Sequence, residues 1–238
     1  MIDTYVALDL ETTGLNPKTD KIIEIGAAKV VSGEISDTYV TFVDPGRHLD
    51  PKIIELTGIR DEMLTDAKSP LTAIKELYEF MEDDILLGHG ILFDYSFCKR
   101  CAVNAGIPTA KKETKAIDTL RISRTLLPDM PSRRLSDLCR YYQIRQEAHR
   151  AFEDARATHF LFQKLQELFF QENQALFQPK ILNYQVKKES PATKFQKDRL
   201  RAVMEYHHLE MDIDIDQLTK NEASRRIDQI FLKYGRMR

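Results

Sequence analysis

LDLETTG, residues 8–14, follows the apolar run 5–8, and together they predict a buried β-strand that ends in a turn. Alternate residues of a strand point to the same face, so we expect Asp9 and Glu11 to project together from the end of this strand. The Thr-Thr-Gly that follows interrupts the strand and offers hydroxyl and amide groups beside the two carboxylates. Local geometry alone therefore predicts one edge of a polar site.

Three more titratable residues stand at comparable positions further along the chain. Asp94, in HGILFD, begins a helical stretch just after the apolar run 85–87, which predicts another strand. His149 and Asp154, in HRAFED, lie just before and within the first turns of a long amphipathic helix that starts near residue 151. Strand ends and helix starts are where open α/β sheets build their sites, and these positions favour one shared site.

The residue types indicate a particular chemistry. Hard divalent cations such as Mg²⁺ and Mn²⁺ prefer oxygen ligands, and two of them roughly 3.5–4 Å apart can hold the attacking and leaving oxygens of an in-line phosphoryl displacement. Four carboxylates are a suitable ligand set for such a pair. A histidine, with an ordinary pKa near ~6.5, is suited to accept the proton of an attacking water at neutral pH.

The strings LDLETTG, H-x-x-x-F-D and H-R-A-x-x-D-A, in this order and spacing, resemble the three motifs of the DEDDh branch of the DnaQ-like 3′–5′ exonucleases. Two further strings, IIELTGIRDEML at 53–64 and AIDTLRISRTLLP at 116–128, are similar to the proofreading domain of PolC-type DNA polymerases and to the epsilon subunit of DNA polymerase III. The resemblance covers about residues 3–170. Because several motifs carry it together, it is specific.

The resemblance implies a fold, a cofactor and a set of roles. The fold would be ribonuclease-H-like, with two Mg²⁺ ions that Mn²⁺ can replace. The activity would be release of nucleoside monophosphates from single-stranded or frayed DNA 3′ ends, in proofreading or repair alongside replication or repair proteins. The implied metal ligands are Asp9, Glu11, Asp94 and Asp154, the general base is His149, and the residues that grip the 3′-terminal nucleotide are Thr12, Thr13, Leu56 and Phe93.

Two other functions stay open at this point. An RNA-directed 3′–5′ exonuclease would share all of these motifs, because only contacts to the 2′-hydroxyl separate the two substrates. A non-catalytic module that holds nucleic-acid ends would also use this fold. Degenerate motifs would favour that second alternative, whereas this chain retains all four acids and the histidine of the motifs.

One position departs from the family pattern. The second motif usually reads His-Asn, and this chain has His89-Gly90. Without the Asn side-chain amide, the loop loses a possible support, but the four acids and His149 are not affected. For His89 we favour a role in ordering the loop or in the core over a catalytic one.

Composition limits the classes of protein that fit. The chain has 238 residues, of which 42% are hydrophobic and 30% are charged. No apolar run approaches the ~20 residues of a membrane helix, and no cationic leader precedes an apolar stretch. The three cysteines make no paired framework, which is typical of a reducing compartment. We therefore expect a cytoplasmic protein without a membrane partner.

The hydrophobic pattern predicts a mixed α/β domain. Strands are expected at about 4–10, 21–31, 35–43 and 84–88, with a hairpin between the second and third. Helices are expected at about 70–82, 94–105, 119–127, 133–142 and 151–172. A mixed sheet flanked by helices accommodates this order of elements, and we place this domain at residues 1–177.

The remaining residues predict an appendage of a different kind. Residues 178–192 are polar, weakly periodic and contain two prolines, which indicates a linker, and 193–238 predict a small helical module. Residues 1–179 carry 22 Lys/Arg against 28 Asp/Glu, whereas 180–238 carry 13 against 9. We expect this basic end to favour the binding of a polyanion such as single-stranded DNA. The Arg133-Arg134 pair can either meet a phosphate backbone or lie in solvent at a helix start.

Overall fold

The computed structural model describes residues 1–108, 113–146, 149–210 and 214–237, and the chain divides into two compact units, Met1–Val186 and Lys187–Arg238. The elements of the first unit are β1 (Tyr5–Thr12), β2 (Ile22–Val31), β3 (Glu34–Phe42), α1 (Pro51–Thr57), η1 (Asp61–Leu64), α2 (Pro70–Met81), β4 (Leu86–Gly88), α3 (Leu92–Ala105), β5 (Lys115–Asp118), α4 (Thr119–Leu126), α5 (Leu135–Tyr142), α6 (Ala151–Phe177) and β6 (Lys180–Ile181).

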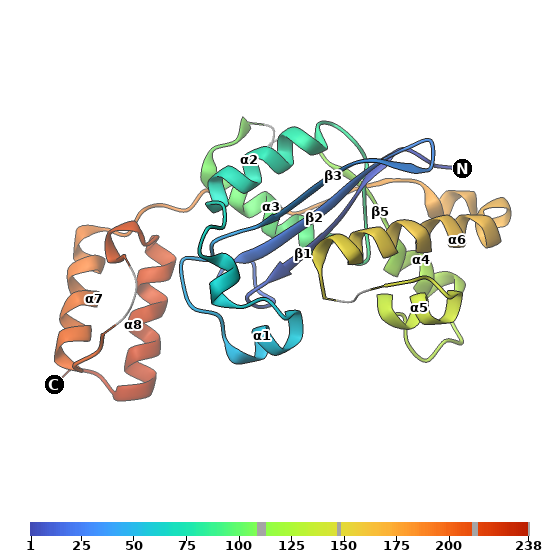
Figure 1. Ribbon diagram of the computed structural model, residues 1–238. Helices are drawn as coiled ribbons and strands as arrows, with labels where there is room; N and C mark the ends of the chain where they lie inside the picture. Colours follow the sequence, from blue (N-terminus) through green and yellow to red (C-terminus); the bar gives the residue numbers. More distant parts are fainter. Residues whose placement is uncertain (109–112, 147–148, 211–213, 238) are drawn as a thin grey trace. The chain divides into compact units, whose positions relative to one another are not determined.

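A six-stranded mixed sheet is the centre of the first unit, in the order β3-β2-β1-β4-β5-β6 (Figure 1). β1 pairs antiparallel with β2, and β2 antiparallel with β3, whereas β1, β4 and β5 run parallel. The C-terminal ends of the three parallel strands therefore meet at one edge of the sheet, which we call the C-terminal edge. This arrangement confirms the predicted mixed α/β class.

Helices cover both faces of the sheet because side chains alternate along β1. Val6, Leu8 and Leu10 belong to one buried cluster, which they share with residues of α2 and α3. Tyr5 and Ala7 belong to the other, with residues of α4, α5 and α6. Asp9 and Glu11 continue the Tyr5–Ala7 series and so point to the face that α6 covers. The same alternation that buries the core thus aims the first two carboxylates.

The hydrophobic pattern did not predict four elements of the first unit: α1, η1, β5 and β6. α1 is a seven-residue helix, with Asp50 as its N-cap and Gly58 in the left-handed region at its end. β5 has four residues and β6 has two, too few for a period-two pattern to show. Because β6 pairs with β5, part of the segment expected to be a linker belongs to the first unit. α6 also extends past the predicted end at 172, with non-helical backbone at Asn173.

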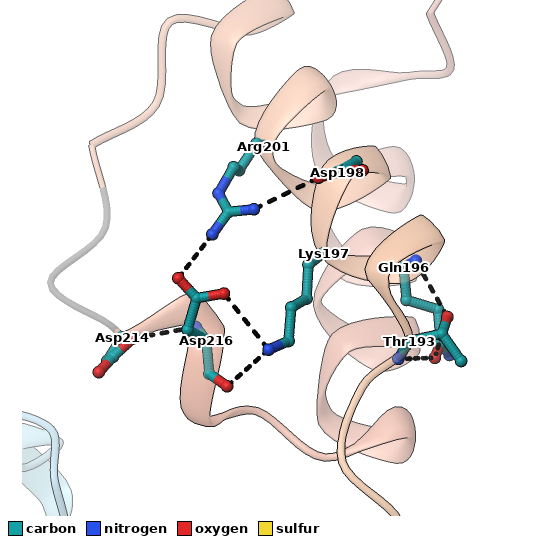
Figure 2. Close-up of polar contacts among 7 residues, drawn as sticks. All are labelled: Thr193, Gln196, Lys197, Asp198, Arg201, Asp214 and Asp216. Carbon is teal, nitrogen blue, oxygen red and sulfur yellow. Dashed lines mark hydrogen bonds and ion pairs between the residues drawn. The ribbon is translucent and has the colours of Figure 1, made fainter.

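The second unit contains α7 (Lys194–Tyr206), η3 (Ile215–Gln217) and α8 (Lys220–Tyr234), which pack around Leu200, Val203 and Ile227. Both long helices begin with a capping box, formed by Thr193 and Gln196 in α7 and by Thr219 and Glu222 in α8. Figure 2 shows a polar network at the surface of α7. In it the carboxylate of Asp216 pairs with Arg201 at 2.8 Å and with Lys197 at 3.3 Å. Across the described parts of both units, no helix is long and apolar enough to span a bilayer.

Candidate active site

Asp94 ties the second motif to the first. It lies in the first turn of α3, and its side chain is among the most buried charged groups of the chain, with 4% exposure. Its Oδ1 accepts the backbone N–H of Leu10 at 3.1 Å. Leu10 stands between Asp9 and Glu11, so this hydrogen bond fixes the start of α3 against the end of β1. Carboxylates separated by more than eighty residues in the sequence are thereby brought to one place.

Asp154 and His149 approach from the third motif. Asp154 lies in the first turn of α6, where Gln146 Nε2 donates to its Oδ1 at 2.5 Å and the His149 N–H donates to its Oδ2 at 3.1 Å. His149 has a φ of +68°, a left-handed conformation that is uncommon for residues other than glycine. One ligand atom from each of Glu11, His149 and Asp154 lies within 4.8 Å of the others. The exposed histidine thus stands beside the acids.

We call the four predicted acids the carboxylate cluster: Asp9, Glu11, Asp94 and Asp154. Burial, and then the charges of the other members, raise the pKa of Asp9 well above its usual range. Burial with nearby carboxylates raises the pKa of Glu11 to about 8, and burial raises the pKa of Asp94 to about 8. Burial also raises the pKa of Asp154. Each shift shows that negative charge here is poorly compensated by the protein itself.

The chemistry of this donor set fits divalent cations. The cluster offers only carboxylate oxygens, with one imidazole beside them, and hard cations prefer such oxygens. The raised pKa values mean that the ionised form of these carboxylates is disfavoured in the protein. Added positive charge would stabilise that ionised form. Asp9, Glu11, Asp94 and Asp154 are therefore the residues that could hold metal ions.

Glu24 and Arg150 also belong to the site, although the sequence analysis did not single them out. Glu24 is directly opposite Glu11 across the β1–β2 ladder, and its side chain is 1% exposed. Arg150 donates to both of its carboxylate oxygens, at 2.8 to 3.3 Å, and the Ala151 N–H donates to Oε2 at 3.1 Å. Glu24 therefore anchors the start of α6, and the available signal was a carboxylate inside the apolar run of β2.

Gly26 lets α6 approach this closely. A Cβ atom at Gly26 would lie 2.1 Å from the backbone nitrogen of Phe152 and 2.2 Å from the carbonyl carbon of Ala151. Backbone atoms cannot yield as the end of a flexible side chain can. The absence of a side chain at this position thus sets the distance between β2 and the helix that carries Asp154.

Gly26→Ala is expected to lower the free energy of unfolding by about 1–3 kcal/mol, as overpacking does, and to reduce activity because Asp154 moves away from β1. Urea unfolding and a nuclease assay of the same preparation measure both effects. Val31→Ala, an exposed position of the same strand, is the matched control. Wild-type values for both quantities would show that this contact does not position α6.

His89 and Gly90 order the loop after β4. His89 Nε2 donates to the Arg133 carbonyl at 2.7 Å, and Nδ1 lies 2.9 Å from the hydroxyl of Thr119. Burial lowers the pKa of His89, which favours the neutral ring. Gly90 has a φ of +87°, and its N–H donates to Asp118 at 3.0 Å. Because glycine adopts this conformation without strain, Gly90 in place of the usual Asn is compatible with the loop conformation.

The four predicted nucleotide-binding residues lie on three different segments. The Thr12 hydroxyl donates to the Gly14 carbonyl at 2.7 Å, whereas the Thr13 hydroxyl accepts the Lys21 N–H at 2.9 Å and bonds Arg47. Leu56, on α1, is 54% exposed. Phe93 precedes Asp94 and packs on Phe97, with ring centroids 5.1 Å apart. Contact of these residues with a nucleotide stays a prediction.

Comparison with known proteins identifies the class. A family model described as "Exonuclease" matches residues 6–162, and the chain belongs to this exonuclease family. A relative within it is the PolC-type DNA polymerase III of Bacillus subtilis (strain 168), which is 42% identical over 164 residues. The match covers 68% of this chain and 11% of that polymerase. The chain thus spans about a tenth of the length of the curated relatives that it matches.

Solved structures agree on the fold. The zinc-bound E. coli exonuclease I–ssDNA complex superposes with a TM-score of 0.62 at 20% identity, covering 74% of this chain and 42% of that one. The Mg²⁺- and Mn²⁺-bound form of S. pombe Pop2p gives a TM-score of 0.60 at 19% identity, covering 71% and 84%. These likenesses, with the family match, confirm the ribonuclease-H-like fold that the motifs implied.

Proposed function

We propose that this protein is a metal-dependent 3′–5′ exonuclease that releases nucleoside monophosphates from single-stranded or frayed DNA ends. The observation that carries the proposal is the meeting of the carboxylate cluster with His149 at one edge of the sheet. Family membership and similarity to a PolC-type polymerase support the same activity. The DNA substrate is favoured because one similar structure is a complex with single-stranded DNA.

Each residue of the site would have a separate role in hydrolysis. His149, exposed beside Glu11 and Asp154, takes the proton from the attacking water. The hydrogen bond from the His149 N–H to Asp154 holds the loop so that the imidazole stays near the acids. Two Mg²⁺ ions, which Mn²⁺ can replace, would supply the positive charge that stabilises the phosphoryl transition state. Thr12, Thr13, Leu56 and Phe93 would hold the terminal nucleotide.

Proofreading or repair at replicating DNA is the setting that fits this activity. Proteins of replication or repair would be its partners, and a cytoplasmic location would fit such a role. Similarity to a segment of a replicative polymerase supports this setting.

The purified protein should digest a 5′-labelled DNA strand from its 3′ end in the presence of Mg²⁺, release nucleoside 5′-monophosphates, and stop when EDTA is added. A matched RNA strand tests the alternative substrate. Faster digestion of RNA would assign the protein to exoribonucleases. Binding without any hydrolysis under Mg²⁺ or Mn²⁺ would instead leave a non-catalytic module.

We further propose that the second unit helps to hold the strand. Residues 187–238 contain 12 Lys/Arg against 9 Asp/Glu. Lys197 and Arg201 pair with Asp216, whereas Lys194 and Lys220, at the starts of the two helices, have no ion-pair partner among the described residues. Cations near helix starts, where the backbone dipole is also positive, favour a polyanion.

A chain that ends at Val186, which keeps β6, should bind a long single strand with a shallower salt dependence than the full chain. Each lost phosphate contact lowers the slope of log K against log salt by about 0.7. Hydrolysis of a dinucleotide should hardly change. Fluorescence anisotropy at several salt concentrations gives the slopes. Equal slopes would indicate that the unit docks a protein or stabilises the chain.

A further inference from the structure

A basic pocket lies at the C-terminal edge of the sheet, outside the carboxylate cluster. Its volume is about 510 Å³, and its lining joins the loop after β4, residues of the first and last turns of α4, and the segment that leads into α5. Three arginines, one histidine and two leucines make up most of the lining, namely Arg124, Arg133, Arg134, His89, Leu120 and Leu135. No carboxylate is among the described residues that line this pocket. Its charge is therefore positive.

The three arginines have different roles. Arg133 is built into the fold, because its guanidinium donates to the carbonyls of Leu127 and Pro128 and its own carbonyl accepts from His89. Arg124 and Arg134 are exposed, and neither guanidinium has a hydrogen bond or ion pair within the part of the chain that the structure describes. Two uncompensated guanidiniums facing one pocket are suited to a bidentate oxyanion such as a phosphate.

The pocket is adjacent to the carboxylate cluster. Leu120, in its wall, lies against Gly90, four residues before Asp94, and a Cβ on Gly90 would be 3.5 Å from Leu120 Cδ2. Asp118 connects the two regions, since it caps α4 and binds the Gly90 N–H. The charge of Asp118 acts on both His89 and Asp94. A strand whose 3′ end lies at the acids therefore has the pocket within reach of its backbone.

We propose that Arg124 and Arg134 bind a backbone phosphate of the substrate strand, upstream of the bond that is cut, with the sugar against Leu120 and Leu135. This inference rests on the proposed function for the identity of the strand. It assigns to the arginine pair the binding of longer substrates, distinct from the hydrolytic chemistry. A cationic site beside the carboxylate cluster attracts a polyanion, which the carboxylates themselves cannot do.

The test compares Arg124→Gln, Arg134→Gln and the double variant with Arg140→Gln. Arg140 is a matched control because it lies on α5, pairs with Asp137 at 3.3 Å, and does not line this pocket. Binding of a labelled ten-nucleotide DNA strand is measured by anisotropy with Ca²⁺ across a range of salt. The double variant should bind about tenfold more weakly, with a salt slope shallower by about 0.7. Arg140→Gln should match wild type.

Hydrolysis of a p-nitrophenyl ester of thymidine 5′-monophosphate separates this proposal from the proposed function. The ester is too small to reach the pocket, so the double variant should cleave it at the wild-type kcat, while KM for the ten-nucleotide strand rises about tenfold. A salt slope and KM equal to those of Arg140→Gln would overturn the arginine site. If the wild-type protein did not cleave the ester, the nuclease function would be refuted. The anisotropy result would still show whether Arg124 and Arg134 bind the strand.

Discussion

Asp94→Asn is expected to lower the exonuclease rate by roughly 10³-fold or more while the fold persists. Metal ions contribute several kcal/mol of transition-state stabilisation in such sites, and about 1.4 kcal/mol corresponds to a tenfold change. The amide keeps an oxygen that can accept the Leu10 N–H, so the hydrogen bond between α3 and β1 survives. Single-turnover digestion of a labelled strand measures the loss. The same decrease is expected for alanine at the other members of the carboxylate cluster.

The matched control is Glu153→Gln, next to Asp154 in the first turn of α6. Glu153 pairs with Arg156 at 2.5 Å and is not a member of the cluster. This variant should retain activity within a few fold. A fully active Asp94→Asn would remove Asp94 from the metal ligands. Comparable losses in Asp94→Asn and Glu153→Gln would show that the effect is not specific to the carboxylate cluster.

The same cluster determines how stability depends on pH without metal. Glu11 and Asp94 have folded-state pKa values of about 8, whereas unfolded carboxylates titrate near ~4. Between these values the folded protein binds more protons than the unfolded one, so the free energy of unfolding falls as pH rises from about 4 to 8. Urea unfolding in EDTA at pH 5 and pH 8 should show this decrease. Asp94→Asn should reduce it, and Mg²⁺ should restore stability at pH 8.

Local patterns predicted where most residues of the candidate site lie, because each motif places a residue at the end or the start of an element. Alternation in β1 aims Asp9 and Glu11 at the same face, and Asp94 and Asp154 each occupy the first turn of a helix. Which residues support these carboxylates depends on contacts that sequence spacing does not encode. The Arg150–Glu24 pair joins residues 126 positions apart, across a strand and a helix start.

Short elements were the part of the fold that could not be predicted. β6 consists of Lys180 and Ile181, and its only sequence signal is a polar stretch after α6. Pairing with β5 overrides that signal, because the exposed edge of a sheet gains hydrogen bonds from any chain that returns along it. Likewise, α1 depends on its caps, Asp50 and Gly58, more than on an apolar stripe.

His149→Ala should lower kcat by roughly 10²–10⁴-fold with little change in affinity for the 3′ end, as expected when a general base is lost. The acid limb of the rate profile, which reflects protonation of that base, should disappear. Because the side chain is exposed, added imidazole should recover part of the rate. His208→Ala, an exposed histidine of the second unit, should behave as wild type.

The position of His149 permits a second role that the same variant can separate from the first. Its ring lies in a group of possible metal ligands with Glu11 and Asp154. If His149 is a metal ligand, its loss weakens metal binding. The Mn²⁺ concentration for half-maximal activity would then rise in His149→Ala, and saturating Mn²⁺ would restore kcat. If His149 is the general base, the half-maximal Mn²⁺ concentration of His149→Ala stays within about twofold of the wild-type value, and kcat stays low at saturating Mn²⁺. We expect the second pattern, because four carboxylates already provide the oxygen ligands that Mg²⁺ prefers.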